Sequence, residues 1–192
     1  MPSPKNKIKL PAVASDTKIL SFDLESNGLH GQAFAVGAVV VDMQGEVLDK
    51  FTARVEIVGE LDDWVAKNVI PFIEDMSISH KTYNDMCSDF WTWFVKAQEL
   101  SDYVVVQNGY PVEYSFLLDC QNQDLNTRYW QHPFPILDIT SMQIQAGLSP
   151  EERIISEKNI LKQNKLSKHH PLHDAQSTAL QTVLLVKPTI EN

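Results

Sequence analysis

Apolar residues in the first third of the chain form runs that are separated by short polar turns. Three such runs cover residues 18–25, 34–42 and 47–55, and Met43-Gln44-Gly45-Glu46 supplies the turn between the last two. Runs rich in Val, Ile and Phe that end at turn residues are typical of β-strands, and strands joined by short turns pair antiparallel. We therefore predict an antiparallel meander of three strands.

Apolar residues in the rest of the chain recur mostly at helical spacing. The pattern is clearest over residues 83–100, which predicts an amphipathic helix. Short apolar runs at residues 103–107 and 136–138 are too brief for helices and predict two further strands. Further helices are expected at residues 60–72, where Pro71 leaves a short helix and a turn, and at residues 112–120, 139–146, 154–163 and 174–186.

This order of elements predicts the fold class. Three consecutive strands followed by strands that alternate with helices favour one α/β domain with a mixed sheet, because an all-parallel sheet needs a helical crossover between every pair of strands. The 192 residues and the 43% hydrophobic content fit one globular domain. We expect this domain at residues 17–188, a flexible leader at residues 1–16 and a tail at residues 189–192.

Charge and cysteine content exclude several classes of protein. The formal net charge of −9 argues against a protein that coats duplexes, so a nucleic-acid partner would be held by a local site or by metal ions. Cys87 and Cys120 are too few for a disulfide scaffold and lack paired zinc-ligand spacing, which favours reduced thiols and a cytoplasmic location. No apolar run approaches the length of a signal peptide core or a membrane span, so no membrane partner is expected.

Two carboxylates interrupt the first predicted strand. Asp23 and Glu25 are two positions apart, so on a strand they point to the same face. A buried pair of carboxylates is unfavourable, because like charges repel strongly at low dielectric and desolvation adds to the cost. A bound divalent cation is the simplest compensation.

Three further stretches carry candidate chemistry near strand ends and helix starts, where α/β folds place ligands. Glu113 lies in the first turn of the helix that follows the strand at residues 103–107. His169 precedes Asp174 by five residues, which allows an imidazole and a carboxylate to enter one site. Asp138 ends the last predicted strand, and we interpret it as a structural or supporting residue.

Each of these carboxylates also has a structural interpretation. Asp23 and Glu25 could form the half-exposed polar face of an ordinary strand. Glu113 could be a solvated acid that is favoured by the helix dipole, and Asp174 could cap the last helix. The zinc site suggested by His169, His170 and His173 is not expected, because Pro171 interferes with a regular helix there and no third soft ligand follows. Two aromatic residues outside the predicted core are candidates for base stacking: Trp64 and Tyr110.

Taken in order, these motifs resemble the three exonuclease motifs of the DEDD superfamily of 3′-to-5′ exonucleases, histidine branch, which includes DnaQ-like and RNase T-like enzymes. Residues 22–29 and 36–42 are similar to the first motif, and residues 169–178 are similar to the third. The resemblance extends over residues 18–185. It implies an RNase H-like fold, with a mixed five-stranded sheet of three antiparallel strands and then parallel strands, flanked by helices.

The second motif departs from the family pattern. Family members usually have Asn, three residues and then Asp, whereas here four residues separate Asn108 from Glu113. Phe116-Leu117 still aligns with the family's helix if Glu113 takes the place of the Asp, which favours one inserted residue in the turn. Asp102 and Asp119 are the alternative candidates for this position.

The resemblance implies a metal-dependent 3′-to-5′ exonuclease that releases nucleoside 5′-monophosphates from single-stranded ends, with RNA as the preferred substrate. The enzyme would bind two Mg²⁺ or Mn²⁺ ions, because these cations prefer oxygen ligands such as carboxylates. Asp23, Glu25 and Asp174 would hold the first ion, and Asp23 would bridge to a second near Glu113. His169 would be the general base for the attacking water.

The resemblance also suggests how the substrate is held. Asn27, Gly28, Leu29 and Asn108 would contact the 3′ end of single-stranded RNA or DNA, with Leu29 as a wedge against the last bases. A homodimer is compatible with the family. Two alternatives stay open: a single-strand DNA exonuclease, and a catalytically impaired relative that binds nucleic acid or a protein partner, which the altered second motif suggests.

Overall fold

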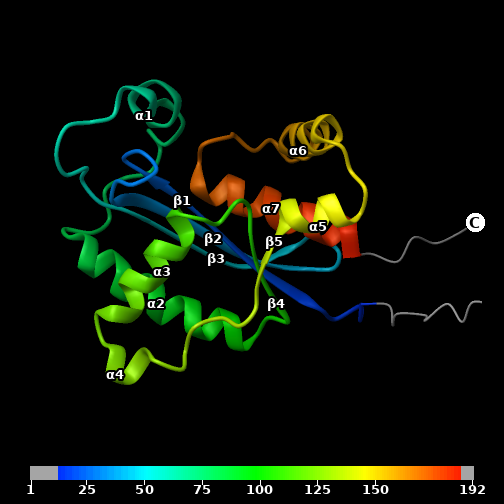
Figure 1. Ribbon diagram of the computed structural model, residues 1–192, viewed down its shortest axis with the longest axis horizontal. Helices are drawn as coiled ribbons and strands as arrows, with labels where there is room; N and C mark the ends of the chain where they lie inside the picture. Colours follow the sequence, from blue (N-terminus) through cyan, green and yellow to red (C-terminus); the bar gives the residue numbers. More distant parts are fainter. Residues whose placement is uncertain (1–12, 187–192) are drawn as a thin grey trace, which may run out of the picture.

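The computed structural model describes residues 13–186 and has one mixed sheet between two groups of helices (Figure 1). The strands are β1 (Lys18–Ser26), β2 (Ala33–Asp42), β3 (Val47–Arg54), β4 (Tyr103–Val106) and β5 (Ile136–Asp138). They lie in the order β3-β2-β1-β4-β5. β1 pairs antiparallel with β2, which pairs antiparallel with β3, while β4 runs parallel to β1 and β5 runs parallel to β4. The predicted mixed RNase H-like sheet is confirmed, with β1 at its centre.

The helices cover both faces of this sheet. They are α1 (Asp63–Asn68), the 3₁₀ helix η1 (Ile70–Phe72), α2 (Tyr83–Glu99), α3 (Val112–Asn122), α4 (Leu125–Arg128), α5 (Ile139–Gln145), α6 (Pro150–Asn164) and α7 (Pro171–Val186). In Figure 1, α2 and α3 lie below the sheet, whereas α5 and α7 lie above it.

Alternation along β1 separates the two halves of the core. Leu20, Phe22 and Leu24 face α2 and α3 and pack in an aromatic layer, in which the ring centroids of Phe22 and Phe94 are 5.6 Å apart. Ile19 points the other way, into the smaller core beneath α5 and α7. Because neighbouring side chains alternate along a strand, Asp23 and Glu25 also belong to the α7 face.

Two helix starts differ from the prediction. α6 begins at Pro150 instead of residue 154, because Ser149 and Glu152 form a capping box that satisfies the first free N–H groups. α7 begins at Pro171 instead of residue 174. Proline interrupts a helix interior but fits the first position, where its missing N–H would have no partner. Pro171 therefore marks the start of α7, and His169 and His170 lie outside the helix, in agreement with the expectation that Pro171 interferes with a regular helix through the three histidines.

Two short elements and the chain ends complete the description. Residues 60–72 form α1 and η1, as the interruption by Pro71 suggested, whereas the single turn α4 was not predicted. Residues 1–12 of the expected leader and the expected tail at residues 189–192 lie outside the described residues.

Within residues 13–186, every helix is too short or too polar to cross a membrane. Cys87 and Cys120 are buried free thiols, in agreement with the prediction that they do not form a disulfide.

Candidate carboxylate site

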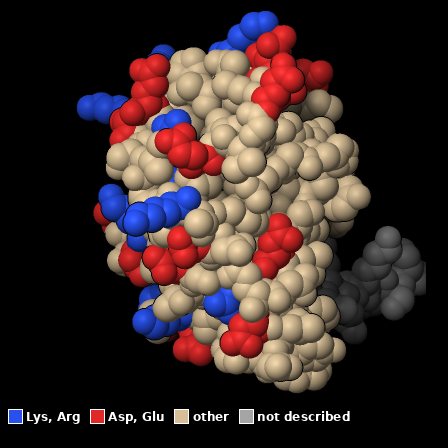
Figure 2. Space-filling view, turned by 90° about the vertical axis from the view of Figure 1, so that its left-hand side faces the viewer, with Lys and Arg blue, Asp and Glu red and all other residues tan. Residues whose placement is uncertain are grey.

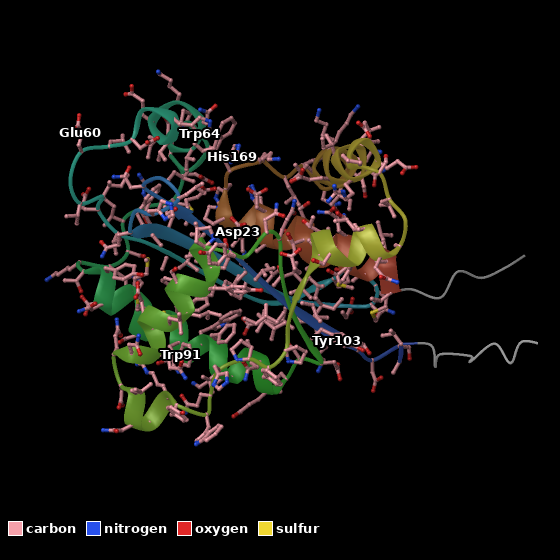
Figure 3. All side chains as sticks on the ribbon, viewed as in Figure 1. Asp23, Glu60, Trp64, Trp91, Tyr103 and His169 are labelled. Atoms are coloured by element: carbon pink, nitrogen blue, oxygen red, sulfur yellow. The ribbon has the colours of Figure 1, made fainter. Side chains whose placement is uncertain are left out.

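The carboxylate pair lies on the central strand β1, and Figure 3 shows Asp23 near the middle of the view. Glu25 is only 8% exposed and Asp23 is half-buried, so neither is an ordinary surface acid. The interpretation of this pair as the polar face of an exposed strand is therefore wrong.

A glycine on the neighbouring strand brings α7 close to the pair. Gly37 pairs across the sheet with Asp23. A Cβ atom placed on Gly37 would lie 2.0 Å from the backbone nitrogen of Leu172, a distance at which the atoms overlap. Only glycine permits this contact. The first turn of α7, which contains Asp174, therefore rests directly on β2 beside Asp23.

Asp174 and His169 hold each other in place ahead of α7. The backbone N–H of His169 donates a hydrogen bond to Oδ2 of Asp174, with a donor–acceptor distance of 2.7 Å. His169 adopts a left-handed backbone conformation, with φ of +62°, which turns the chain into the helix. Side-chain ligand atoms of Glu25, His169 and Asp174 all lie within 4.8 Å of one another. The first and third motifs of the sequence thus meet at one point.

The second motif reaches the same place from the other face of the sheet. Glu113 lies in the first turn of α3 and is 6% exposed. Its charge acts on both Asp23 and Glu25, and the backbone N–H of Leu24 interacts with its carboxylate. Glu113 is therefore the acid of this motif that joins the pair, not a solvated first-turn residue.

The alternative residues for the second motif lie elsewhere. Asp102 precedes β4, at the end opposite to Glu113, and accepts a hydrogen bond from the backbone N–H of Lys18 at 2.9 Å. Asp119 accepts a hydrogen bond from the hydroxyl of Tyr83 at 2.7 Å. Both are engaged in structural contacts of their own.

The pKa values show the electrostatic cost of assembling these acids. Burial, followed by the charge of Asp174, raises the pKa of Glu25 to about 8. Burial raises the pKa of Glu113 to about 7 and that of Asp174 to about 7. The pKa of Asp23 lies well above its usual range because of burial and the nearby acids, of which Asp174 contributes most. Four ionised carboxylates at this spacing need a positive charge among them.

The donor atoms fit a hard divalent cation. Oδ1 of Asp174 is buried and has no hydrogen-bond partner within residues 13–186. A buried acceptor without a donor is costly, and a metal ion would supply the missing partner. Carboxylate oxygens are the ligands that Mg²⁺ and Mn²⁺ prefer.

Three residues line the carboxylate cavity that sequence reasoning missed: Gln107, Glu157 and Lys168. Lys168 Nζ lies 3.2 Å from Glu157 Oε2, so an ion pair joins α6 to the segment that carries His169. The cavity has a volume of about 210 Å³. Lys168 could have been noticed as the neighbour of His169, whereas nothing in the helical pattern distinguishes Glu157 from other solvated acids.

His169 lies against an aromatic wall. Its ring meets the ring of Trp64 edge-on, with centroids 5.4 Å apart, and the ring of Phe72 at 6.3 Å (Figure 3). Burial, followed by the charge of Lys168, lowers the pKa of His169. The imidazole is therefore neutral near pH 7 and can accept a proton.

The other two histidines of this segment do not point to the same site. His170 and His173 stack on each other with ring centroids 4.0 Å apart. Nε2 of His170 lies 3.6 Å from Oδ1 of Asp75, and Nδ1 of His173 accepts a hydrogen bond from the backbone N–H of Ser167. The group of metal-binding side chains found among residues 13–186 contains neither His170 nor His173.

Two of the four residues expected to bind substrate line a neighbouring cavity of about 480 Å³. Gly28 and Leu29 line it together with Trp64, and Leu29 is 70% exposed. The side chain of Asn27 is used internally, because it accepts from the N–H of Asp62 and donates to the carbonyl of Glu60. Asn27 therefore braces the segment before α1 against the β1–β2 turn.

Asn108 and Asp138 lie on the other side of the carboxylates. Asn108 lines the carboxylate cavity and accepts a hydrogen bond from the hydroxyl of Thr140. Asp138 caps α5 by accepting from the N–H of Ser141, and it also accepts from the N–H of Gly109 in the turn before α3. Its supporting role, as interpreted from the sequence, agrees with these contacts.

A larger cavity, of about 790 Å³, is apart from this chemistry. It lies between α3 and the segment after α4, and its lining residues include Trp130, His132 and Phe134 but none of the four carboxylates. Tyr110, the second stacking candidate, lines neither this cavity nor the carboxylate cavity and is highly exposed.

Comparisons with known proteins support the fold. Neither the scan of protein-family models nor the search of curated proteins finds a match. Among solved structures, the chain is similar to a product-bound exonuclease I, with a TM-score of 0.58 and 13% identity over 90% of this chain and 44% of that one. The Escherichia coli exonuclease I complex with a dT13 oligonucleotide gives 0.58 and 14% over 88% and 41%. A zinc-bound form of the E. coli exonuclease I complex with single-stranded DNA gives 0.55 and 15% over 90% and 40%. This chain thus spans less than half the length of these proteins, and it has the RNase H-like fold of exonuclease I.

Proposed function

We propose that this protein is a metal-dependent 3′-to-5′ exonuclease that hydrolyses single-stranded nucleic acid to nucleoside 5′-monophosphates. One observation carries the proposal: ligand atoms of Glu25, His169 and Asp174 lie within 4.8 Å of one another, and the charges of Asp174, Glu113 and Glu25 all act on Asp23. A cluster of acids with raised pKa values at the end of a central strand is costly for stability, which favours a functional explanation.

The carboxylates would hold the metal ions. Asp23, Glu25 and Asp174 would hold one ion, and Asp23 and Glu113 would hold a second. When bound, two Mg²⁺ or Mn²⁺ ions would neutralise charge on the scissile phosphate and acidify the attacking water. The zinc-bound exonuclease I complex supports a divalent cation at a site on this fold.

His169 is the proposed general base. Its half-buried ring has a lowered pKa, so it is unprotonated near neutral pH and can accept a proton from the attacking water. The hydrogen bond from its N–H to Asp174 fixes its backbone, and Trp64 restricts its ring. The proton would move to the imidazole while the carboxylates stay ionised.

The strand would be held by local contacts instead of a basic surface. On the face in Figure 2, Lys and Arg side chains lie next to Asp and Glu side chains and form no continuous basic area. The cavity lined by Gly28, Leu29 and Trp64 adjoins Glu25 and offers apolar side chains to a terminal nucleoside. Base stacking of this kind binds single strands with little dependence on sequence.

Both RNA and DNA are candidate substrates within this proposal. The sequence favours RNA, whereas the exonuclease I complex with dT13 favours DNA. Hydrolysis of matched RNA and DNA oligonucleotides under identical conditions separates the two, and equal turnover would remove the RNA preference. The homodimer and the cytoplasmic location stay predictions.

The test of the proposal is release of nucleotides from a 3′-labelled oligonucleotide with Mg²⁺ or Mn²⁺. Asp23→Ala and His169→Ala should abolish release, whereas Asp102→Asn, which removes an acid outside the cluster, should preserve it. Wild-type rates in both site variants would contradict the assignment. Calorimetry with Mn²⁺ tests the alternative of an impaired relative, since a folded protein that binds no Mn²⁺ would favour that alternative over an enzyme.

A further inference from the structure

A second polar cavity adjoins the carboxylate cavity on the side of α5 and α6. It has a volume of about 220 Å³ and shares Gln107, Asn108 and Glu157 with the carboxylate cavity. Its other polar lining residues are Thr140, Gln143, Arg153 and Gln181. We call it the Arg153 cavity.

The side chain of Arg153 has a buried hydrogen-bond donor without an acceptor. Its Nε atom is buried and makes no hydrogen bond within residues 13–186. Its side chain forms no ion pair among these residues either. Buried donors in native proteins almost always have an acceptor, so this guanidinium indicates a ligand that supplies one.

Two side-chain amides lining the cavity also have free donors. The carbonyl of Gln107 accepts from the hydroxyl of Thr178 at 3.3 Å, and the carbonyl of Asn108 accepts from the hydroxyl of Thr140 at 2.9 Å. Each amide therefore has an NH₂ group left without a partner within residues 13–186. A guanidinium and two NH₂ groups provide hydrogen-bond donors without competing acceptors.

The remaining polar groups of the lining are already paired. The amide of Gln143 donates to that of Gln181 at 2.7 Å. Glu157 is the one carboxylate of the lining, and the ammonium group of Lys168 lies 3.2 Å from it. The Glu157 charge is thus compensated from outside the cavity, which leaves the positive charge of Arg153 for a ligand.

We propose that the Arg153 cavity binds a phosphate group, namely the backbone phosphate of the nucleotide next to the one being removed. The proposal rests on the proposed exonuclease function, because a strand whose scissile phosphate lies at the carboxylates has its next phosphate within one nucleotide of that point. Arg suits this task because its planar fork donates two hydrogen bonds to phosphate oxygens. Arg153 would thus position the strand, while the carboxylates and His169 carry out the reaction.

The first experiment measures binding directly. The NMR resonance of the Arg153 Nε–H group is followed while the metal-free protein is titrated with a 5′-phosphorylated dinucleotide or, separately, with inorganic phosphate. A shift with the dinucleotide alone supports a backbone phosphate. A shift with inorganic phosphate alone supports a phosphate site but overturns the backbone assignment, and no shift with either ligand overturns the site.

The second experiment measures hydrolysis. Arg153→Met should raise KM about 10- to 100-fold with little change in kcat, the effect expected for loss of hydrogen bonds to a charged group. The second substrate is an oligonucleotide with one neutral methylphosphonate at the second linkage from its 3′ end. The wild-type KM for this substrate should be raised to a similar extent, whereas the KM of Arg153→Met should be the same for both substrates. Lys158→Met removes an exposed charge from the same helix and should behave as wild type.

The outcomes separate this site from the proposed function. Wild-type KM in a folded Arg153→Met protein, with continued sensitivity to the methylphosphonate, would overturn the role of Arg153. A shifted Arg153 resonance in a wild-type protein that hydrolyses nothing would leave the phosphate site in place and refute the exonuclease. Arg153→Lys keeps the charge without the fork and should give an intermediate KM.

Discussion

Two helices bring acids to β1 from opposite faces of the sheet, and they are fixed in different ways. α7 rests on β2 with backbone against backbone, since Gly37 leaves no room for a side chain below Leu172. α3 follows a turn with one more residue than the family pattern, and Glu113 reaches the site with a longer side chain than Asp. We therefore expect the site to tolerate a change of side-chain length at Glu113, but not the addition of a side chain at Gly37, where two backbones are in contact.

The largest effect on stability is expected at the close contact. Gly37→Ala places a methyl group on the backbone of Leu172, so α7 must move away from β2. We expect a loss of about 3 kcal/mol in the free energy of unfolding, because overpacked sites cannot relax. Displacing Asp174 by about 1 Å should also reduce activity by about 100-fold. Denaturant titration and the nucleotide-release assay measure the two effects.

Gly59→Ala is the control for this substitution. A Cβ atom on Gly59 meets no atom within 4 Å, although its φ of +89° imposes a local conformational cost. The control should therefore lose some stability and keep full activity. If Gly37→Ala behaved in the same way, the close contact would not position the site.

The two helices should also differ in their tolerance of substitution at the acids themselves. Asp174→Asn removes the charge and one oxygen of a proposed ligand of the first ion, so its loss of activity should exceed the roughly 10- to 100-fold typical of supporting residues. Glu113→Gln should lose less, and Glu113→Asp should retain part of the activity. Equal losses of activity in all three variants would show that α3 and α7 do not differ in their tolerance of substitution at these acids.

The stability of the metal-free protein should depend on pH. Glu25, Glu113 and Asp174 have pKa values of about 8, about 7 and about 7, against ordinary values near 4. Between pH 4 and 8 these three acids therefore bind more protons in the folded protein than in the unfolded chain, and their contribution to stability falls as pH rises through this window. We expect Tm at pH 8 to lie at least about 5 °C below Tm at pH 5.

Saturating Mg²⁺ or Mn²⁺ should reduce this decline, because the ions replace the protons as compensating charge. Glu25→Gln should also reduce it, as it removes the group with the highest of these pKa values. A metal-free protein whose Tm rises from pH 5 to pH 8 would contradict the raised pKa values.

The smallest effect is expected at the aromatic wall. Trp64→Ala removes the edge-on contact with His169, and contacts of this kind contribute enough to change rates by roughly 2- to 10-fold. Trp130→Ala is the matched control, because Trp130 is 85% exposed and lies in the larger cavity, away from the carboxylates. Steady-state kinetics measure both variants. A lower rate for Trp130→Ala than for Trp64→Ala would mean that the stacking surface important for activity lies in the larger cavity.

The sequence predicts well what is encoded by local spacing. Asp23 and Glu25 are recognisable because strand residues two apart share a face, and the spacing from His169 to Asp174 fits a turn entering a helix. The order of elements is enough to predict the mixed sheet. Ser149 and Glu152 were available as a capping-box signal for the start of α6 and were overlooked.

The sequence does not show which distant surfaces meet. Gly37 is visible as a glycine within a strand, but its role depends on how α7 docks on β2. Glu157 and Arg153 lie four residues apart on α6, and only the packing of that helix brings Glu157 beside the carboxylates and Arg153 into the adjoining cavity. Such tertiary contacts leave no periodic pattern in one chain.

The most direct test of the carboxylate site is crystallographic. Crystals of the protein soaked with Mn²⁺ and a nucleoside 5′-monophosphate would locate the metal by its anomalous scattering. The account predicts Mn²⁺ bound by Asp23, Glu25 and Asp174, a second ion near Glu113, and the nucleotide phosphate in contact with both ions. Mn²⁺ bound elsewhere, with the four acids empty and the nucleotide away from them, would contradict it.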